Sequence, residues 1–420
     1  VPLPSKVRLK LSPASAGMDR ALWFDAAIDG ATKGPDRPLT VDETATAEAL
    51  VVGLSFVILF WAARSQFAAG GVRFTAKWIA FLGLACAAIA LTQSATAPKL
   101  IYWTWRPVNG NASPFGPFVN RNDLATWLII AIPITIGYTT ARVQSRRIEA
   151  HGPVEVGKIV DATAVWLATS ICIMTAALVS SMSRSGLLAG SAAMLTLVAL
   201  SRRRLPAAGR SWLMAGIAAA IVIGATYANI DALMTRVGET VTLGVGGRRE
   251  IWGETIPMAR DFWLTGVGTG AYARAMSVYQ SPHVFSFNHA HDEYLQLLVE
   301  GGVLYAVLVG VAIAAAGLAI IRRLRADQTP VFWIRAGAAS GLVAVLVQSV
   351  WETGLRMPAN AVLFAVCAAL ALHRAALLTR GDPPGPPSPS LAGTPRSPLR
   401  SGVLNSQRAI GTARGAPVGV

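Results

Sequence analysis

Apolar residues gather into separated runs along this chain, each of about 15 to 20 residues. A run of that length crosses, or nearly crosses, the roughly 30 Å hydrocarbon core of a bilayer as an α-helix. The pattern predicts an all-α, polytopic transmembrane helical bundle with about nine spans. The expected spans are Ala49–Ala63, Trp78–Gln93, Leu124–Ala141, Ile159–Met182, Leu187–Leu200, Trp212–Asn229, Val303–Ile321, Trp333–Val350 and Ala361–Leu378.

Alternate connections between these spans are basic, and the positive-inside rule assigns such connections to the cytoplasmic side. Their cations are Arg64, Arg73 and Lys77; Arg142, Arg146, Arg147 and Lys158; Arg202, Arg203, Arg204 and Arg210; and Arg322, Arg323 and Arg325. The other connections then face outward, which for a bacterial inner-membrane protein is the periplasm. They are the stretch before Ala49, Ser94–Asp123, Ser183–Gly186, Ile230–Gly302 and Trp351–Asn360.

This topology divides the chain into five segments. We expect a periplasmic segment at 1–48, transmembrane helices within 49–229, a large periplasmic loop with short helices and most of the polar motifs at 230–302, and transmembrane helices within 303–378. Residues 379–420 are basic and rich in Pro and Gly, and predict a disordered cytoplasmic tail. Because the chain starts at Val1 without a signal-peptide pattern and its first 48 residues fall outside, we also expect earlier spans upstream.

Composition supports a membrane protein and argues against several other classes. Hydrophobic residues make up 53% and charged residues 14% of the chain, and the mean hydropathy is +0.48, unlike a soluble globular domain. The net charge of +15 arises largely between spans, where cations set orientation, so no nucleic acid partner is predicted. The cysteines Cys86, Cys172 and Cys367 lie in apolar runs without metal-ligand or disulfide spacing.

A serine-rich corner interrupts the long apolar stretch between Val160 and Leu200. One interpretation is structural, because Gly186 permits a chain reversal, the serines cap helix ends and Arg184 reaches headgroups. The other is functional: Arg184, between the hydroxyls of Ser183 and Ser185 at the outer membrane edge, binds a phosphate through its guanidinium. The residues alone leave both open.

The large outward loop begins with a glycine turn at Gly246 and Gly247, followed by residues at helical spacing. Trp252, Ile256, Ala259 and Trp263 share one predicted helix face, with Arg248 a turn earlier. Such a helix would lie in the membrane interface and bring Arg248 to headgroup depth, as an anchor or as a ligand.

A glycine-rich segment, Gly266-Val267-Gly268-Thr269-Gly270, follows that helix. It lacks the βαβ context and the spacing of a dinucleotide-binding loop, so nucleotide binding is not predicted.

The densest polar cluster is Asn288-His289-Ala290-His291-Asp292-Glu293-Tyr294, directly before an apolar span. A histidine can transfer protons near neutral pH, and a neighbouring carboxylate could orient it. Two alternatives remain. His289 and His291 could ligate zinc with an adjacent carboxylate, although their spacing puts them on opposite sides of a helix, or the cluster could be interfacial, with Tyr294 in the aromatic belt.

Taken in order, these motifs resemble those of the O-antigen ligase and polymerase superfamily. The matching segments are Phe115-Gly116-Pro117-Phe118-Val119-Asn120-Arg121-Asn122, Ser183-Arg184-Ser185-Gly186, Gly247-Arg248 with Ile251-Trp252, Gly266-Val267-Gly268, and His289-Ala290-His291 with Tyr294-Leu295. The resemblance spans roughly Ser94 to Leu378, and the outward loop before the third-last span fits it too.

The resemblance implies a metal-independent, inverting glycosyltransferase that uses an undecaprenyl-pyrophosphate-linked glycan donor and no cofactor. Arg184 and Arg248 would bind the pyrophosphate, and His291 would act as the base; these three are the candidate catalytic residues. The candidate substrate-binding residues are Arg184, Arg248, Arg249, Ser183, Ser185, Asn120, Arg121, His289, Asp292 and Tyr294. The family commonly has Asn after the catalytic histidine, whereas this chain has Asp292, a carboxylate that could strengthen the base or repel the donor.

The acceptor and one competing class of function stay open. A growing O-antigen or exopolysaccharide chain, a lipid A core and a protein hydroxyl are all possible acceptors, so the chain could be a polymerase, a ligase or a protein O-oligosaccharyltransferase. The alternative class is a membrane transporter of lipid-linked glycan or another small substrate. Transporters place functional charges near the bilayer midplane, where Asp161 and Gln348 are the few polar residues near or within a predicted span.

Overall fold

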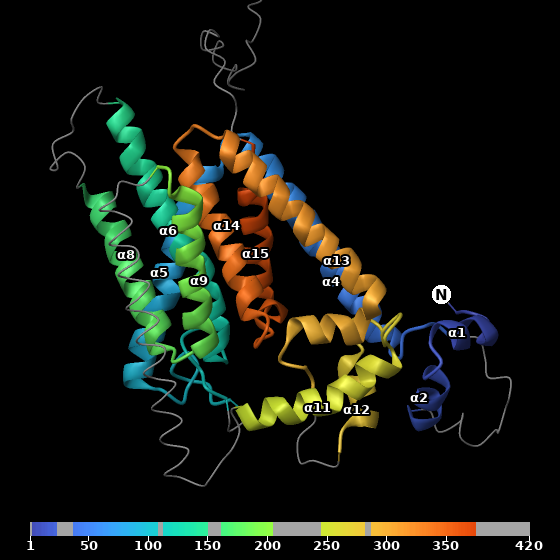
Figure 1. Cartoon of the computed structure of the whole chain (residues 1–420). Helices are drawn as coiled ribbons and strands as arrows, with labels where there is room; N and C mark the ends of the chain where they lie inside the picture. Colours follow the sequence, from blue (N-terminus) through green and yellow to red (C-terminus); the bar gives the residue numbers. More distant parts are fainter. Residues whose placement is uncertain are drawn as a thin grey trace, which may run out of the picture. The chain divides into compact units, whose positions relative to one another are not determined.

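The computed structural model describes residues 2–22, 37–107, 112–149, 161–204, 245–281 and 287–374, and these form helices and loops without a β-strand. The α-helices are α1 (Ser5–Leu11), α2 (Ser15–Leu22), α4 (Glu43–Ala68), α5 (Val72–Thr96), α6 (Arg121–Glu149), α8 (Ala162–Ser180), α9 (Arg184–Ser201), α11 (Val245–Asp261), α12 (Tyr272–Tyr279), α13 (Glu293–Ala326), α14 (Val331–Gln348) and α15 (Pro358–Ala371). A 3-10 turn, η1 (Gly354–Arg356), precedes α15. The all-α prediction is confirmed (Figure 1).

Seven of the described helices, α4, α5, α6, α8, α9, α13 and α14, are long and apolar enough to cross a membrane, and α15 is a shorter apolar helix. Each coincides with a predicted span, which confirms a multi-pass membrane bundle. The predicted span Trp212–Asn229 and the tail at 379–420 lie outside the described residues.

Helices α6 and α14 form the centre of the bundle and approach each other closely. A Cβ added to Gly137 would come within 2.2 Å of the Trp333 carbonyl oxygen, and one added to Gly337 within 2.2 Å of the Pro133 oxygen. Small residues at a helix crossing let the two backbones approach closely. Inside a bilayer the hydrophobic effect does not drive helices together, so close packing of this kind contributes to their association. α5, α8, α9 and α15 pack around this pair.

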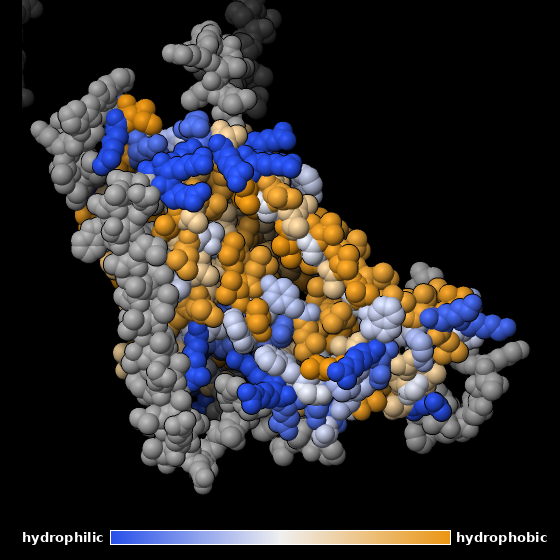
Figure 2. Space-filling view, in the orientation of Figure 1, coloured by the Kyte–Doolittle hydropathy of each residue, from blue (hydrophilic) through white to orange (hydrophobic). Residues whose placement is uncertain are grey.

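Helices α4 and α13 lie at the periphery. In the apolar windows of these helices, 0% and 6% of residues respectively are buried, as expected for surfaces that contact lipid. α4 packs mainly on α15. Figure 2 shows hydrophobic residues along the middle of the molecule and hydrophilic residues gathered at both ends.

The basic connections and the sequence motifs lie at opposite ends of the bundle (Figure 1). α6 runs from the motif end to the basic end, and α8 returns from Ala162 to Ser180 at the motif end. Near the basic end Asp161 caps α8, accepting a hydrogen bond from the Ala164 amide at 2.9 Å, and pairs with Arg142 and Arg146 at 2.6 and 2.7 Å. These contacts give Asp161 a structural role.

A second apolar core lies at the motif end and joins the loop helices to the beginning of the chain. Met258 of α11, Phe262 directly after it, Tyr272 of α12, Val299 of α13 and Val41 before α4 are buried together. The described helices of the loop before the α13 span therefore form a packed module, the loop module.

Helix α13 begins within that module and leaves it at a break. Gly302 has a non-helical backbone with φ of 66°, and a Cβ there would lie 2.3 Å from the Leu264 carbonyl oxygen. Only glycine fits such a conformation and such a contact without strain. The apolar span of α13 therefore starts at Val303, where the sequence placed it.

Candidate functional site

The serine corner holds the first turn of α9 at the motif end. Ser183 caps the helix by accepting a hydrogen bond from the Gly186 amide at 3.2 Å. A Cβ on Gly186 would meet that of Ala125 at 2.7 Å, so this glycine lets α9 begin directly against α6. Arg184 is the first residue of the helix and its side chain is exposed. The N-terminal partial charge of α9 and this guanidinium both favour an anion at this place.

Glu352, which the sequence reasoning missed, connects the corner to Arg248. It lies in the turn after α14 and its side chain is only 8% exposed. Its Oε1 accepts hydrogen bonds from Arg248 Nη2 at 2.5 Å, Asn122 Nδ2 at 2.8 Å and Ser185 Oγ at 3.5 Å. One carboxylate thus joins the starts of α6 and α9 to α11, three segments that are distant in sequence.

This arrangement leaves Arg248 able to bind a further anion. Glu352 contacts one nitrogen of the guanidinium, and the Arg248 side chain is 30% exposed. A guanidinium has five N–H donors in a fixed plane, so other donors can face a ligand while Glu352 fixes the orientation. Burial raises the pKa of Glu352, and its three donors pull that pKa the other way.

Helix α11 carries Arg248 one turn before Trp252, as the sequence predicted. On the predicted face Ala259 is buried, while Ile256 and Trp263 are 41% and 57% exposed. The buried side of the segment packs on the second apolar core, which also takes in residues from α12 and α13.

The histidine motif, His289-Ala290-His291, is held in place by hydrogen bonds to the backbone N–H and carbonyl oxygen of Ala290. The Ala290 amide donates to Gln296 Oε1 at 2.9 Å, and its carbonyl oxygen accepts from Trp252 Nε1 at 2.8 Å. Ala290 is fully buried, so His289 and His291 project from a fixed point. His291 has φ of 52°, a left-handed conformation that costs roughly 1–3 kcal/mol and persists only where the surroundings enforce it.

Burial and neighbouring positive charge favour the neutral forms of both imidazoles. Burial lowers the pKa of His291, and the positive charge of Arg248 lowers it further. The pKa of His289 falls to about 4, through burial and then the positive charge of Arg356. A neutral imidazole next to a guanidinium can accept a proton, as a general base requires.

Asp292, the residue where the sequence departs from the family pattern, caps α13. Its Oδ1 accepts hydrogen bonds from the amides of Tyr294 and Leu295 at 2.9 and 3.0 Å. Burial raises the pKa of Asp292, while these amides lower it. Asn serves equally well as an N-cap, so this departure conserves the helix start. Tyr294 is 44% exposed and its hydroxyl donates to the Leu346 carbonyl at 2.7 Å, a link to α14.

A buried polar network around Glu300 of α13 supports the histidine motif. Glu300 accepts hydrogen bonds from Gln296 Nε2 at 2.8 Å and the Gly270 amide at 3.0 Å, and it lies 3.4 Å from Arg356 Nη2. The Gly268 amide in turn donates to the Glu300 carbonyl. The glycine-rich segment therefore packs on α13 as a structural element, with positive φ at Gly266, Gly268 and Gly270.

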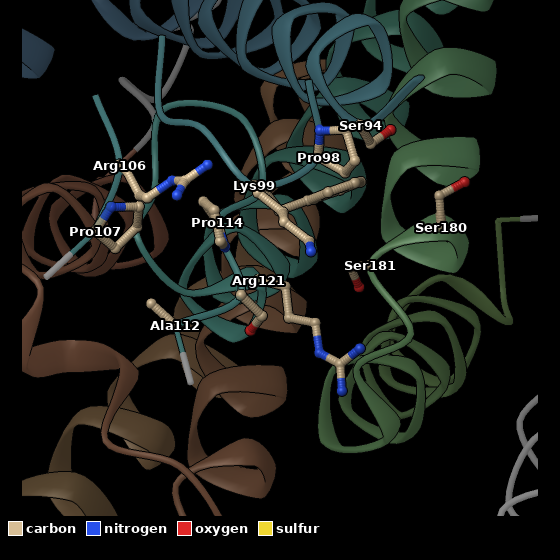
Figure 3. Close-up of a pocket in the computed structure, with 12 residues that line it drawn as sticks. Ser94, Pro98, Lys99, Arg106, Pro107, Ala112, Pro114, Arg121, Ser180 and Ser181 are labelled. Atoms are coloured by element: carbon tan, nitrogen blue, oxygen red, sulfur yellow. The ribbon is translucent and has the colours of Figure 1, made fainter. Parts of the chain in front are cut away.

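The remaining predicted residues occupy other places. Asn120 Oδ1 accepts a hydrogen bond from the Asn122 amide at 2.9 Å, which shapes the entry to α6. Arg249 is exposed. Arg121 lines a separate cavity beside the serine corner (Figure 3). Within the described ranges, no three His, Cys, Asp or Glu side chains gather as a metal site would require.

A family model described as O-antigen ligase matches residues 169–310. Over these residues the chain is similar to the O-antigen ligase family. The O-antigen ligase region includes the serine corner, Arg248 and the histidine motif, and so confirms the resemblance read from the sequence. Glu352, Asn122 and Arg121 lie outside it. No curated protein matches the chain.

The sequence held one signal for Glu352. It is a lone carboxylate directly after an apolar span, in a chain with only 22 acidic residues. Its partners could not be found in the same way, because they lie 104 and 230 residues away in the chain.

Proposed function

We propose that this protein transfers a glycan from an undecaprenyl-pyrophosphate carrier to an acceptor hydroxyl at the periplasmic face of the bacterial inner membrane. The observation that carries the proposal is the Glu352 junction, which gathers Ser185, Asn122 and Arg248 at one point. Arg184 stands next to Ser185, and the neutral imidazole of His291 lies within electrostatic reach of Arg248.

The donor diphosphate is held by Arg184 and Arg248, at headgroup depth. His291 accepts the proton of the acceptor hydroxyl as the oxygen forms a bond to the anomeric carbon. The bond from that carbon to the diphosphate oxygen breaks, and its electron pair leaves with the lipid diphosphate. Attack opposite the leaving group inverts the anomeric configuration. The two guanidiniums stabilise the charge that develops on the diphosphate without a metal.

Expected magnitudes follow from these roles. A positioned general base contributes typically about 10²–10⁴ in rate, and a fixed donor at a developing charge contributes about 10²–10³. Replacement of Arg184, Arg248 or His291 by Ala should therefore abolish detectable product while expression and membrane insertion stay normal.

The test is a purified full-length protein incubated with lipid-pyrophosphate glycan and candidate acceptors in EDTA. Product with EDTA supports metal-independent transfer, and the product's identity selects among a growing polysaccharide, a lipid A core and a protein hydroxyl. Full activity in all three variants would refute the assignment.

Orientation has its own test. In a cysteine-free background, Val119→Cys at the motif end should react with a membrane-impermeant maleimide in intact spheroplasts. Arg203→Cys at the basic end, also exposed, should react only after lysis. The reverse pattern would place the site at the cytoplasmic face and contradict the proposal.

A further inference from the structure

A cavity of about 500 Å³ lies beside the serine corner, between the α5–α6 connection and the end of α8. Lys99, Arg106, Ser113, Arg121 and Ser181 are among the residues that line it. Ligand cavities in proteins commonly have volumes of about 300–1,000 Å³, so this one has room for one or two sugar residues.

The charged residues that line this cavity within the described ranges are the cations Lys99, Arg106 and Arg121, and no described carboxylate lines it. Among the described residues none of these three cations forms an ion pair, in contrast with Arg248 and Arg356 at the neighbouring site. Three cations that share one cavity attract an anion that enters it.

The backbone around these cations is restricted. Pro98, Pro107 and Pro114 have fixed φ angles, and the Arg121 amide donates to the Ser113 carbonyl at 3.0 Å. Figure 3 shows the ends of the Lys99 and Arg121 side chains on the side of Ser181, with Arg106 across the cavity.

The cavity is lined by the segments that lead into the proposed reaction site. Ser181 is two residues from Ser183, and Arg121 is next to Asn122, which binds Glu352. His291 and Arg248 approach the same junction from the loop module. A donor diphosphate on Arg184 and Arg248 therefore leaves this cavity free for the other substrate.

We propose that this cavity binds an acidic group, a carboxylate or phosphate, on the acceptor glycan. The inference rests on the proposed function, in which Arg184 and Arg248 hold the donor. It selects an acidic saccharide as the acceptor class, with the acid one or two sugar residues from the hydroxyl that reacts.

The test measures binding and needs no turnover. Full-length protein in zwitterionic nanodiscs is titrated with trigalacturonic acid and, as a neutral probe of similar size, maltotriose. The cavity variant is Lys99→Gln, Arg106→Gln and Arg121→Gln together. The control variant, Arg202→Gln, Arg203→Gln and Arg325→Gln, removes the same formal charge from exposed positions at the basic end.

We expect the acidic probe to bind more weakly as salt rises and the neutral probe to bind poorly. The cavity variant should lose about tenfold or more in affinity for trigalacturonic acid, since charge-assisted hydrogen bonds to three cations are removed, and the control variant should keep it. Equal binding of the two probes, or an unchanged affinity in the cavity variant, would overturn the proposal.

A second ligand, undecaprenyl pyrophosphate, separates this inference from the proposed function. The cavity variant should bind the lipid like the parent protein, and Arg184→Gln with Arg248→Gln should not. If the cavity variant alone loses the lipid, the cavity belongs to the donor and the inference is wrong. If the Arg184 and Arg248 variant keeps the lipid, the proposed function fails instead.

Discussion

Replacement of Glu352 by Gln tests whether this carboxylate acts through Arg248. Gln keeps the size of the side chain and can still accept the hydrogen bond from Asn122, which is 2.8 Å away. It removes the negative charge that faces Arg248 Nη2 at 2.5 Å. Arg248 then keeps its own charge but loses the partner that orients its guanidinium.

The size of the effect follows from the exposure of the two partners. A hydrogen bond to a charged group contributes about 1.5–3 kcal/mol. The Arg248 side chain is 30% exposed, so water replaces part of the lost contact, and we take the lower value. About 1.4 kcal/mol is a factor of ten in rate, which predicts about a tenfold fall in kcat for Glu352→Gln.

The assay compares kcat and KM for transfer in four proteins: the parent, Glu352→Gln, Arg248→Gln and the double variant. Arg248→Gln alone should cost about 10²–10³ in kcat. Because the effect of Glu352 runs through Arg248, adding Glu352→Gln should then cost little more. Glu48→Gln, at an exposed position on α4, is the matched control and should behave like the parent. Losses that simply multiply in the double variant would refute the positioning role.

Further predictions concern the histidine motif and helix α13. Burial and Arg248 lower the pKa of His291, and the neutral form is the active one, so activity should rise through a midpoint below about 6.5 as pH increases. Arg248→Gln removes a positive charge and should move the His291 titration, followed by NMR, to higher pH; an unmoved titration would contradict this coupling. Asp292→Asn should keep stability and activity near the parent values, whereas Asp292→Ala should lower the free energy of unfolding by about 1 kcal/mol, measured by denaturant titration in detergent; equal stabilities would refute the cap. Gly302→Ala should lower the thermal unfolding midpoint, because its Cβ would meet the Leu264 carbonyl at 2.3 Å, whereas Gly310→Ala, which meets nothing within 4 Å, should not.

The pattern of apolar runs was enough to predict the membrane helices and the segregation of basic connections. Helix formation in a bilayer depends on local composition, because every backbone polar group must be satisfied within its own segment. Spacing also predicted helix α11, but which of its residues are buried, such as Met258 and Ala259, depends on the helices that pack against it.

The order of the sequence motifs and their resemblance to the O-antigen ligase and polymerase superfamily selected Arg184, Arg248 and His291 as candidates. Only the folded chain decided that Glu352 joins two of their segments and that Arg121 lines a different cavity together with Lys99 and Arg106. The physical reason is that a hydrogen bond depends on distance in space, and residues as far apart as Asn122 and Glu352 meet only after the bundle has packed.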